Sequence, residues 1–517
     1  MTQVANTQKF ALIALEIALL MLILGIAAHL RIANNANTPG WYTDEATHID
    51  IAQNLVEGKV QYLAINQSVL IAGRLPLFGN VLALAMRLFD GDGITVARGL
   101  TGWLGVLSVF LLWLTARLST KDRALAILSA MMLAIYPSAV IYSRIAFSYN
   151  LLTPLVLLAT LGMVMYWRGS RGWLVLASLA IGIGITSDLM IGSLIAPLLV
   201  VAFVRRPLDV FWAIILVALP FGCYAGYMLL TAPDVFIFDF QQTFGRLGGT
   251  PIDEQIFNVA QNYTVLLNQE FWFPLGVVGI FLIRPRHVRG ILALTFFLAF
   301  VLSGRTFALF NLSFYYVTPL LPLLAFGMGA VIRYGAEIIY TSTDFLLWER
   351  FRLNKPVRFV ITAASLVVVV GMPLTFTFTQ TNDQIVDGFV TEIDGFLLNP
   401  AQGRQIADHI NQGIAPDDVV IASVGVAWAI NANVTDFQMS VSYIGVDTVH
   451  FPGDLPPDRY AFDPRYETAT YAVVDNLWVH WGAVHMPAVA DMLADIQANW
   501  TLEVEVGDMR VYRNPTR

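Results

Sequence analysis

Cysteine and charged residues are both scarce in this sequence of 517 residues. The one cysteine, Cys223, cannot form an internal disulfide, and we expect its thiol to be buried within an apolar segment. Charged residues make up 13% of the chain and hydrophobic residues 57%, whereas soluble domains carry about 25% charged residues. This composition excludes an ordinary soluble protein and predicts a polytopic α-helical membrane protein.

A basic region of the kind that binds nucleic acid is also missing. The net charge is −7. Asp and Glu concentrate in the C-terminal part of the chain, while Arg and Lys lie mainly in short loops between apolar segments. An acidic C-terminal region argues against a nucleic acid partner. That region also contains no glycine-rich phosphate loop and no cluster with metal-ligand spacing.

Long apolar segments are what the sequence has instead. Segments 44–57 and 74–89 have helical spacing but are short, so we expect both to lie along the membrane surface, with a further span as the alternative for 74–89. Placing 74–89 at the surface puts all later basic loops on one side of the membrane, as the positive-inside rule requires. About eleven spans are then predicted: 10–30, 96–117, 124–142, 150–167, 173–187, 189–204, 209–230, 270–283, 290–303, 312–332 and 357–378.

The same charge distribution predicts the orientation and the domains. We expect residues 1–380 to form a transmembrane domain in the plasma (inner) membrane, with a cytoplasmic N-terminus and juxtamembrane helices in loop 31–95. Residues 231–268 are expected outside, either as a lid or as a solvated connector. Residues 381–517 are expected to form a soluble extracytoplasmic α/β domain. Its predicted helices are 403–412 and 488–499, and its predicted strands are 418–423, 469–475, 502–506 and 509–512.

Two adjacent carboxylates, Asp44 and Glu45, follow the first span. A carboxylate within hydrogen-bond reach of an acceptor hydroxyl can take its proton, which makes Asp44 a candidate general base. The alternative is that Asp44 caps a helix starting at Glu45. His48 is expected on the solvated face of this helix, with a metal ligand as the alternative.

The order of several motifs resembles a known family. These motifs are Tyr42-Thr-Asp-Glu-Ala46, Gly73-Arg-Leu-Pro-Leu77, Phe89-Asp-Gly-Asp-Gly-Ile-Thr-Val-Ala-Arg98, Tyr136-Pro-Ser-Ala-Val-Ile-Tyr-Ser-Arg144 and Phe314-Tyr-Tyr-Val-Thr-Pro-Leu-Leu-Pro322. In order and spacing they are similar to the polyprenyl-phosphate-sugar glycosyltransferases of the GT-C fold. That family includes the protein O-mannosyltransferases and the bacterial aminoarabinose transferases. The likeness extends over nearly the whole chain.

The resemblance implies an inverting membrane glycosyltransferase. It would move a sugar from a polyprenyl-phosphate donor to a lipid, glycan or protein acceptor on the outer face, in contact with membrane lipids. Asp44 matches the family's catalytic Asp, and Glu45 would position the acceptor or Asp44. Candidates for binding the donor phosphate are the expected outward-facing arginines Arg74, Arg144 and Arg305, since a guanidinium donates in a fork. The alternative for Arg74 and Arg144 is contact with lipid headgroups, and the alternative for Arg305 is a structural role. Candidates for substrate binding are Tyr42, His48, Asn150 and Tyr315.

One departure from the family pattern keeps other functions open. Family members commonly carry an acid shortly after the position of Arg144, but here the following residues are Ile-Ala-Phe-Ser-Tyr-Asn150. No cofactor is firmly implied, and a divalent cation is an open alternative. A lipid-linked-sugar transporter and a non-catalytic subunit of a membrane assembly are the two alternative functions.

Overall fold

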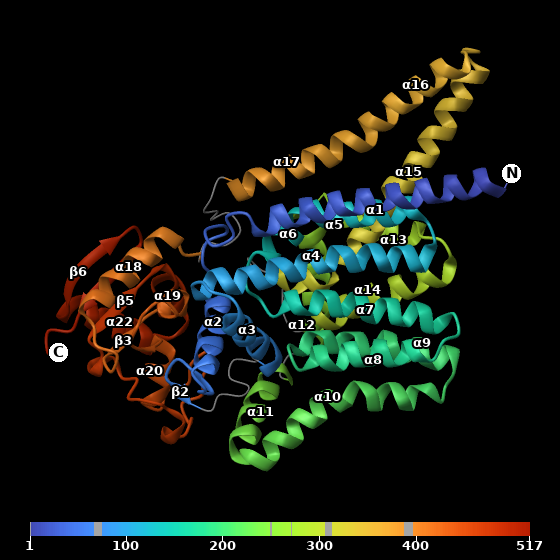
Figure 1. Cartoon of the computed structure of the whole chain (residues 1–517). Coiled ribbons are helices and arrows are strands. Elements are labelled where there is room, and N and C mark those ends of the chain that lie inside the picture. Colours follow the sequence, from blue (N-terminus) through green and yellow to red (C-terminus); the bar gives the residue numbers. More distant parts are fainter. Residues whose placement is uncertain (1, 67–74, 249–250, 270, 305–312, 387–396) are drawn as a thin grey trace.

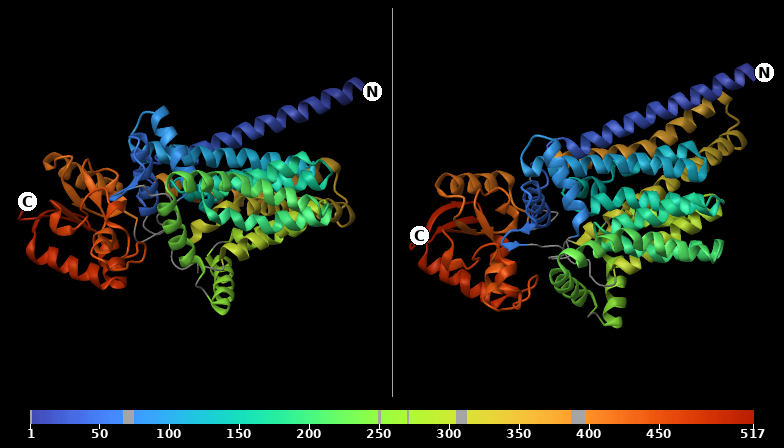
Figure 2. Two further views of the ribbon diagram at one scale, coloured as in Figure 1. Left: turned by 90° about the horizontal axis from the view of Figure 1, so that it is seen from below. Right: turned by 60° about the horizontal axis from the view of Figure 1, so that its bottom comes forward.

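The computed structural model describes residues 2–66, 75–248, 251–269, 271–304, 313–386 and 397–517. Most of the helices run side by side in an elongated bundle, and a unit of strands and short helices lies at one end of it (Figure 1). The two chain termini lie at opposite ends of the molecule (Figures 1 and 2). We call residues 397–517 the C-terminal unit.

Every predicted span is largely helical in the structure. The bundle helices are α1 (Thr2–Ile32), α4 (Gly93–Thr120), α5 (Arg123–Ile135), α6 (Pro137–Ser143), α7 (Tyr149–Trp167), α8 (Gly172–Ile185), α9 (Ile195–Arg205), α10 (Asp209–Thr231), α13 (Trp272–Leu282), α14 (Arg286–Gly304), α15 (Leu321–Glu349), α16 (Lys355–Leu366) and α17 (Met372–Val386). Among the described residues, five helices are long and apolar enough to cross a membrane, or six if the bent α5–α6 pair is one span. The count of about eleven spans therefore stays a prediction.

Local chemistry explains where several bundle helices begin. The side chain of Asp92 accepts a hydrogen bond from the Thr95 amide at 2.9 Å and caps α4. Asp122 caps α5 in the same way through Leu125, at 3.0 Å. Pro137 cannot continue α5 because it lacks an amide hydrogen, and the axis turns by 58° between α5 and α6. This break places the C-terminus of α6 close to the candidate site.

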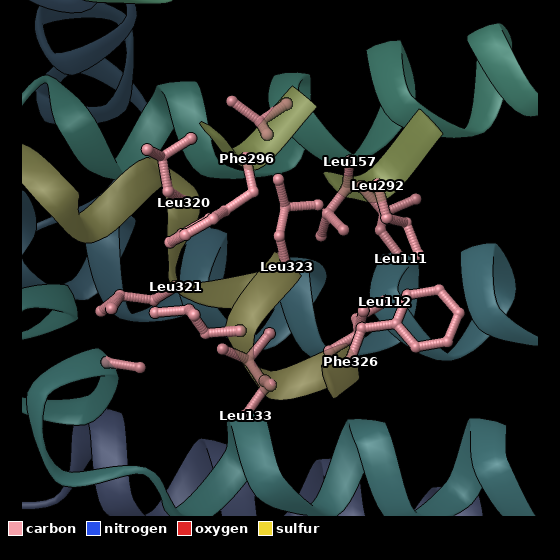
Figure 3. Packing of buried hydrophobic residues seen from close by; sticks show 14 of the residues in the cluster. Leu111, Leu112, Leu133, Leu157, Leu292, Phe296, Leu320, Leu321, Leu323 and Phe326 are labelled. Atoms are coloured by element: carbon pink, nitrogen blue, oxygen red, sulfur yellow. The ribbon is translucent and has the colours of Figure 1, made fainter. Parts of the chain in front are cut away.

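Apolar side chains and small residues hold the bundle together. Leucines and phenylalanines from α4, α5, α7, α14 and α15 interdigitate in its interior (Figure 3). The axes of α13 and α15 approach so closely at Gly279 and Gly327 that a Cβ on Gly279 would overlap the Gly327 carbonyl. Small residues at such crossings allow the backbones to pack in contact, as is common between membrane helices.

Large apolar side chains also cover the outside of the bundle. α1 exposes Phe10 and Met21, and α10 exposes Phe211 and Leu219. Many large exposed apolar side chains on one helix are typical of lipid contact. The expectation of a buried thiol is wrong, because Cys223 is exposed on α10.

Short elements fill the space between the bundle and the C-terminal unit (Figure 1). They are α2 (Thr43–Val56), the hairpin β1 (Gln61–Tyr62) and β2 (Ile65–Asn66), and α3 (Pro76–Leu88). The two predicted short helices are thus confirmed as helices. The segment 231–268, expected to be a lid or a connector, forms α11 (Pro233–Gly248) and α12 (Ile252–Gln269).

The C-terminal unit contains a five-stranded mixed sheet in the order β4-β3-β5-β7-β6. β3 (Val419–Ile421), β4 (Asn433–Thr435) and β5 (Tyr471–Val474) are parallel, and β6 (Thr501–Val506) forms an antiparallel hairpin with β7 (Met509–Arg513). The helices are α18 (Pro400–Gly413), α19 (Val424–Ala427), α20 (Phe437–Tyr443), α21 (Ala483–His485) and α22 (Pro487–Asn499). The predicted helices, strands and closing hairpin are confirmed. α17 continues past residue 380 to Val386, and the domain boundary and the side of the membrane stay predictions.

One apolar core joins the C-terminal unit to the elements that follow α1. Trp41, Ile49 of α2 and Phe78 of α3 share a buried cluster with Val420 of β3 and Val511 of β7. The segment that carries Asp44 is therefore held between the bundle and the C-terminal unit.

Candidate active site

Asp44 lies in the first turn of α2, at the end of the bundle next to the C-terminal unit (Figure 1). α2 begins at Thr43 with Tyr42 as its N-cap residue, so the alternative in which Asp44 caps a helix starting at Glu45 is wrong. The Tyr42 amide instead donates to Glu45 Oε1 at 2.9 Å, so the capping hydrogen bond comes from Glu45, at the third helical position. Asp44 is partly exposed, whereas Glu45 is buried.

The Glu45 carboxylate forms a buried ion pair with Arg98 of α4. Arg98 Nε donates to Glu45 Oε2 at 2.9 Å, and Arg98 Nη2 donates to Glu45 Oε1. The Ala146 amide also donates to Glu45 Oε2, at 3.0 Å. Both side chains of the ion pair are 0% exposed. Glu45 therefore fixes the start of α2, on which Asp44 sits, and its carboxylate is occupied by the buried ion pair.

Two buried arginines hold the connector between α1 and α2. Besides Glu45, Arg98 donates to the carbonyl oxygens of Asn35, Pro39 and Gly40, each at 2.7 Å. Arg144 donates to the carbonyl oxygens of Leu30 and Ala33 at 2.7 Å and of Thr38 at 3.0 Å. Buried carbonyls require donors, and the last carbonyls of a helix have no partner within it. The guanidinium groups supply these donors.

The position of Arg144 corrects the expectation of an outward-facing phosphate ligand. Its side chain is 0% exposed, and its three guanidinium nitrogens donate to one carbonyl at the end of α1 and to two carbonyls of the connector. We therefore assign Arg144 to positioning the connector. The other two predicted phosphate ligands, Arg74 and Arg305, lie outside the described residues.

Tyr42 and Tyr315 come together although they are far apart in the sequence. Their ring centroids are 6.1 Å apart, and Tyr315 also contacts Phe147 at 5.0 Å, Tyr149 at 5.6 Å and Tyr316 at 4.5 Å. The negative charge of Asp44 lies close enough to act on the Tyr315 hydroxyl. We call these five rings the aromatic group. It combines apolar faces with hydroxyls that both donate and accept hydrogen bonds.

Asn150 and His48 are both buried. Asn150 Nδ2 donates to the carbonyls of Tyr142 and Ile145, at 3.0 and 2.8 Å, so this side chain shapes the turn between α6 and α7. His48 is 2% exposed, and its ring meets the edge of Phe78 at 4.8 Å. The expectation of a solvated His48 is therefore wrong, because this face of α2 packs against α3.

Residues that sequence reasoning missed connect the site to the C-terminal unit. Trp41 and Leu398 exchange backbone hydrogen bonds of 2.8 and 2.9 Å, three residues before Asp44. The Trp41 ring meets Trp428 at 4.9 Å, and the Arg404 guanidinium lies over it at 5.3 Å. Trp41, next to the motif that contains Asp44, was the one sequence signal for this contact. Its partners Leu398, Arg404 and Trp428 could not be predicted, because they lie more than 350 residues away in the sequence. Within the described ranges, no group of three or more His, Cys, Asp or Glu side chains is placed to hold a metal ion.

Comparisons with known proteins agree with this architecture. Residues 74–233 match the family model of the dolichyl-phosphate-mannose-protein mannosyltransferases. No curated protein sequence matches the chain. The structure of ArnT from Cupriavidus metallidurans bound to undecaprenyl phosphate is similar, with a TM-score of 0.65 and 15% identity over 98% of each chain.

A second solved structure is more distant and longer. It is the archaeal oligosaccharyltransferase AglB from Archaeoglobus fulgidus in complex with an inhibitory peptide and a dolichol-phosphate. The match has a TM-score of 0.54 and 13% identity, and it covers 96% of this chain and 74% of AglB. The chain therefore has the GT-C fold of the polyprenyl-phosphate-sugar glycosyltransferases, as the order of its sequence motifs predicted.

Proposed function

We propose that the chain is an inverting membrane glycosyltransferase that moves a sugar from a polyprenyl-phosphate donor to an acceptor on the outer face of the membrane. It would lie in the plasma (inner) membrane, with a cytoplasmic N-terminus and an extracytoplasmic C-terminal unit. The observation that carries the proposal is the placement of Asp44. It is partly exposed, lies near the aromatic group and stands on a helix start fixed by the buried Glu45–Arg98 pair.

Asp44 would act as the general base. The acceptor hydroxyl loses its proton to the Asp44 carboxylate as its oxygen attacks the anomeric carbon of the donor. The bond between that carbon and the phosphate oxygen breaks, and polyprenyl phosphate leaves as an anion. A single displacement of this kind inverts the anomeric configuration. Tyr42 and Tyr315 would contact the sugar, and Arg74 and Arg305 are the proposed ligands of the phosphate.

The support for a lipid-phosphate donor comes from the comparisons. The matching family model is named for dolichyl-phosphate-mannose, and two similar structures hold undecaprenyl phosphate and a dolichol-phosphate. The acceptor is a lipid, a glycan or a protein. Whether a divalent cation assists the reaction is tested by assaying with and without a chelator.

The experiment is a turnover assay in detergent with a panel of radiolabelled polyprenyl-phosphate sugars. Wild type is compared with Asp44→Asn, and Asp90→Asn is the matched control because Asp90 is an exposed carboxylate outside the aromatic group. We expect sugar release, to an acceptor or slowly to water, to fall by about 10²–10⁴-fold in Asp44→Asn. The Asp90→Asn rate should equal that of wild type.

Two other outcomes are informative. If Asp44→Asn still releases sugar, the protein is a glycosyltransferase but its general base is another residue. No release by folded wild type from any donor would refute the enzyme. A partner that copurifies tightly would then favour the non-catalytic subunit, which the missing acid after Arg144 motivates.

A further inference from the structure

A small cavity with both polar and apolar lining residues lies between helices of the bundle. It has room for a water molecule or an ion of similar size. Helices α1, α4, α5, α6 and α7 and the segment that leads into α15 line it. Its polar lining side chains are Arg31, Ser108, Ser143, Asn150, Thr153 and Thr318. No carboxylate is among the described residues that line it.

Arg31 brings a positive charge to this cavity. The side chain is 1% exposed. Its Nη1 and Nη2 donate to the carbonyls of Ala134 and Leu133 at the C-terminal end of α5, each at 2.8 Å. These carbonyls and the negative end of the α5 dipole offset about half of one charge. The remaining positive charge is reinforced by Arg144, whose own charge lies near enough to interact with that of Arg31.

Two hydrogen-bond donors at the cavity lack partners among the described residues. They are Arg31 Nε and Thr318 Oγ1, and Thr318 is 4% exposed. A buried polar group without a partner is costly, and in native proteins such groups commonly bind an ordered water or ion. The hydroxyls of Ser108 and Ser143 donate to carbonyls of their own helices, and they can rotate to face a ligand without moving the backbone.

We propose that this cavity binds a small monovalent inorganic anion of about the size of chloride. The Arg31 Nε–H and the Thr318 hydroxyl donate to the anion, whose charge compensates the guanidinium. A water molecule fits the same space but leaves the charge of Arg31 buried within a membrane bundle, where an uncompensated charge is strongly unfavourable. The anion joins α1 to the segment that leads into α15 and stabilises the bundle close to the connector between α1 and α2.

Gly105 makes the room for this site. A Cβ at Gly105 would lie 2.7 Å from both Cδ and Nε of Arg31 and 3.0 Å from the Cβ of Ser143. A side chain there would displace the guanidinium from the cavity. The glycine thus belongs to the anion site as well as to the packing of α4 against α1.

The test compares the full-length protein in detergent in sodium chloride and in sodium gluconate at equal ionic strength. We expect chloride to raise the unfolding temperature of wild type saturably, by about 1–2 °C. Thr318→Val should lose this rise, because the isosteric side chain cannot donate. Thr295→Val is the matched control, since Thr295 is also a buried hydroxyl without a partner in the described chain but does not line the cavity. Its chloride response should equal that of wild type.

Bromide soaked into crystals of the full-length protein locates the ion directly by anomalous diffraction. We expect a peak between Arg31 and Thr318 in wild type and none in Thr318→Val. An equal chloride response in all three proteins, or no response in any, together with no anomalous peak at the cavity, would overturn the proposal and leave a water molecule there.

Discussion

Replacing Arg98 by methionine should destabilise the protein severely and displace the connector and the start of α2, which carries Asp44. The substitution keeps an unbranched side chain of similar length but leaves the Glu45 carboxylate, which is 0% exposed, without its counter-ion. Breaking a buried ion pair by removing one partner costs about 3–5 kcal/mol. The carbonyls of Asn35, Pro39 and Gly40 lose their donor as well. We therefore expect a loss at the upper end of that range, about 5 kcal/mol.

A double-mutant cycle isolates the pair itself. Glu45→Gln is nearly isosteric and keeps an acceptor for the Tyr42 amide, so we expect it to cost about 2–3 kcal/mol. The double variant Glu45→Gln/Arg98→Met should lose about 1–3 kcal/mol less stability than the sum of the losses in the two single variants, because it leaves no unpaired charge. Arg513→Met is the matched control, since Arg513 pairs with Glu503 at 3.3 Å but is 50% exposed, and such pairs contribute about 0–1 kcal/mol.

The readouts are the free energy of unfolding from denaturant titration in detergent and the rate of sugar release. Arg98→Lys retains the charge but not the fork of donors, so its stability and rate should lie between those of wild type and Arg98→Met. If Arg98→Met is no less stable than Arg513→Met, Arg98 does not hold the connector in the way proposed.

Three further predictions concern packing and titration. Gly279→Val should destabilise the bundle by several kcal/mol or abolish folding, because its side chain would overlap the Gly327 backbone; folded yield and unfolding temperature in detergent measure this, with Gly222→Val, where the structure leaves open space, as the control. Burial raises the pKa of Asp436 to about 7, so the folded chain holds a proton that the unfolded chain has lost between about pH 4 and pH 7. Stability should fall as pH rises through that window, and Asp436→Asn, which still caps α20, should make the fall smaller when unfolding is compared at about pH 5 and about pH 8. The remaining fall is expected from Asp50 and Asp475, because burial raises the pKa of these carboxyls too, to about 7 and about 6. Trp41→Ala should cost about 3–5 kcal/mol and lower the rate of sugar release, since it removes the contact between the segment that carries Asp44 and the C-terminal unit; a rate unchanged in folded protein would contradict this role of the contact.

Composition and periodicity were sufficient to predict most of the secondary structure. The apolar segments predicted as spans are helical, and the alternation of short β-branched runs with amphipathic segments predicted the strands and helices of the C-terminal unit. These patterns are local, because each residue of a helix or a strand is placed by neighbours a few positions away. The order of motifs likewise indicated the GT-C fold.

Burial of polar residues could not be predicted in the same way. Arg144 was expected to face outward because it follows an apolar segment, but it donates to carbonyls at the end of α1 and in the connector, more than a hundred residues earlier. His48 was expected on a solvated face, yet α3 covers it. Whether an arginine or a histidine faces water depends on which backbone and side chains arrive beside it, and that depends on long-range packing.

The sequence by itself determined that this is an apolar helical chain with a carboxylate pair after its first apolar helix and a mixed C-terminal unit. Only the tertiary structure gives the two acids different surroundings. Glu45 pairs with Arg98, and Asp44 remains partly exposed near rings contributed by three separate segments. The two acids are adjacent and chemically alike, so the difference comes from helix geometry: consecutive residues of α2 point about 100° apart, one toward α4 and the other toward the aromatic group.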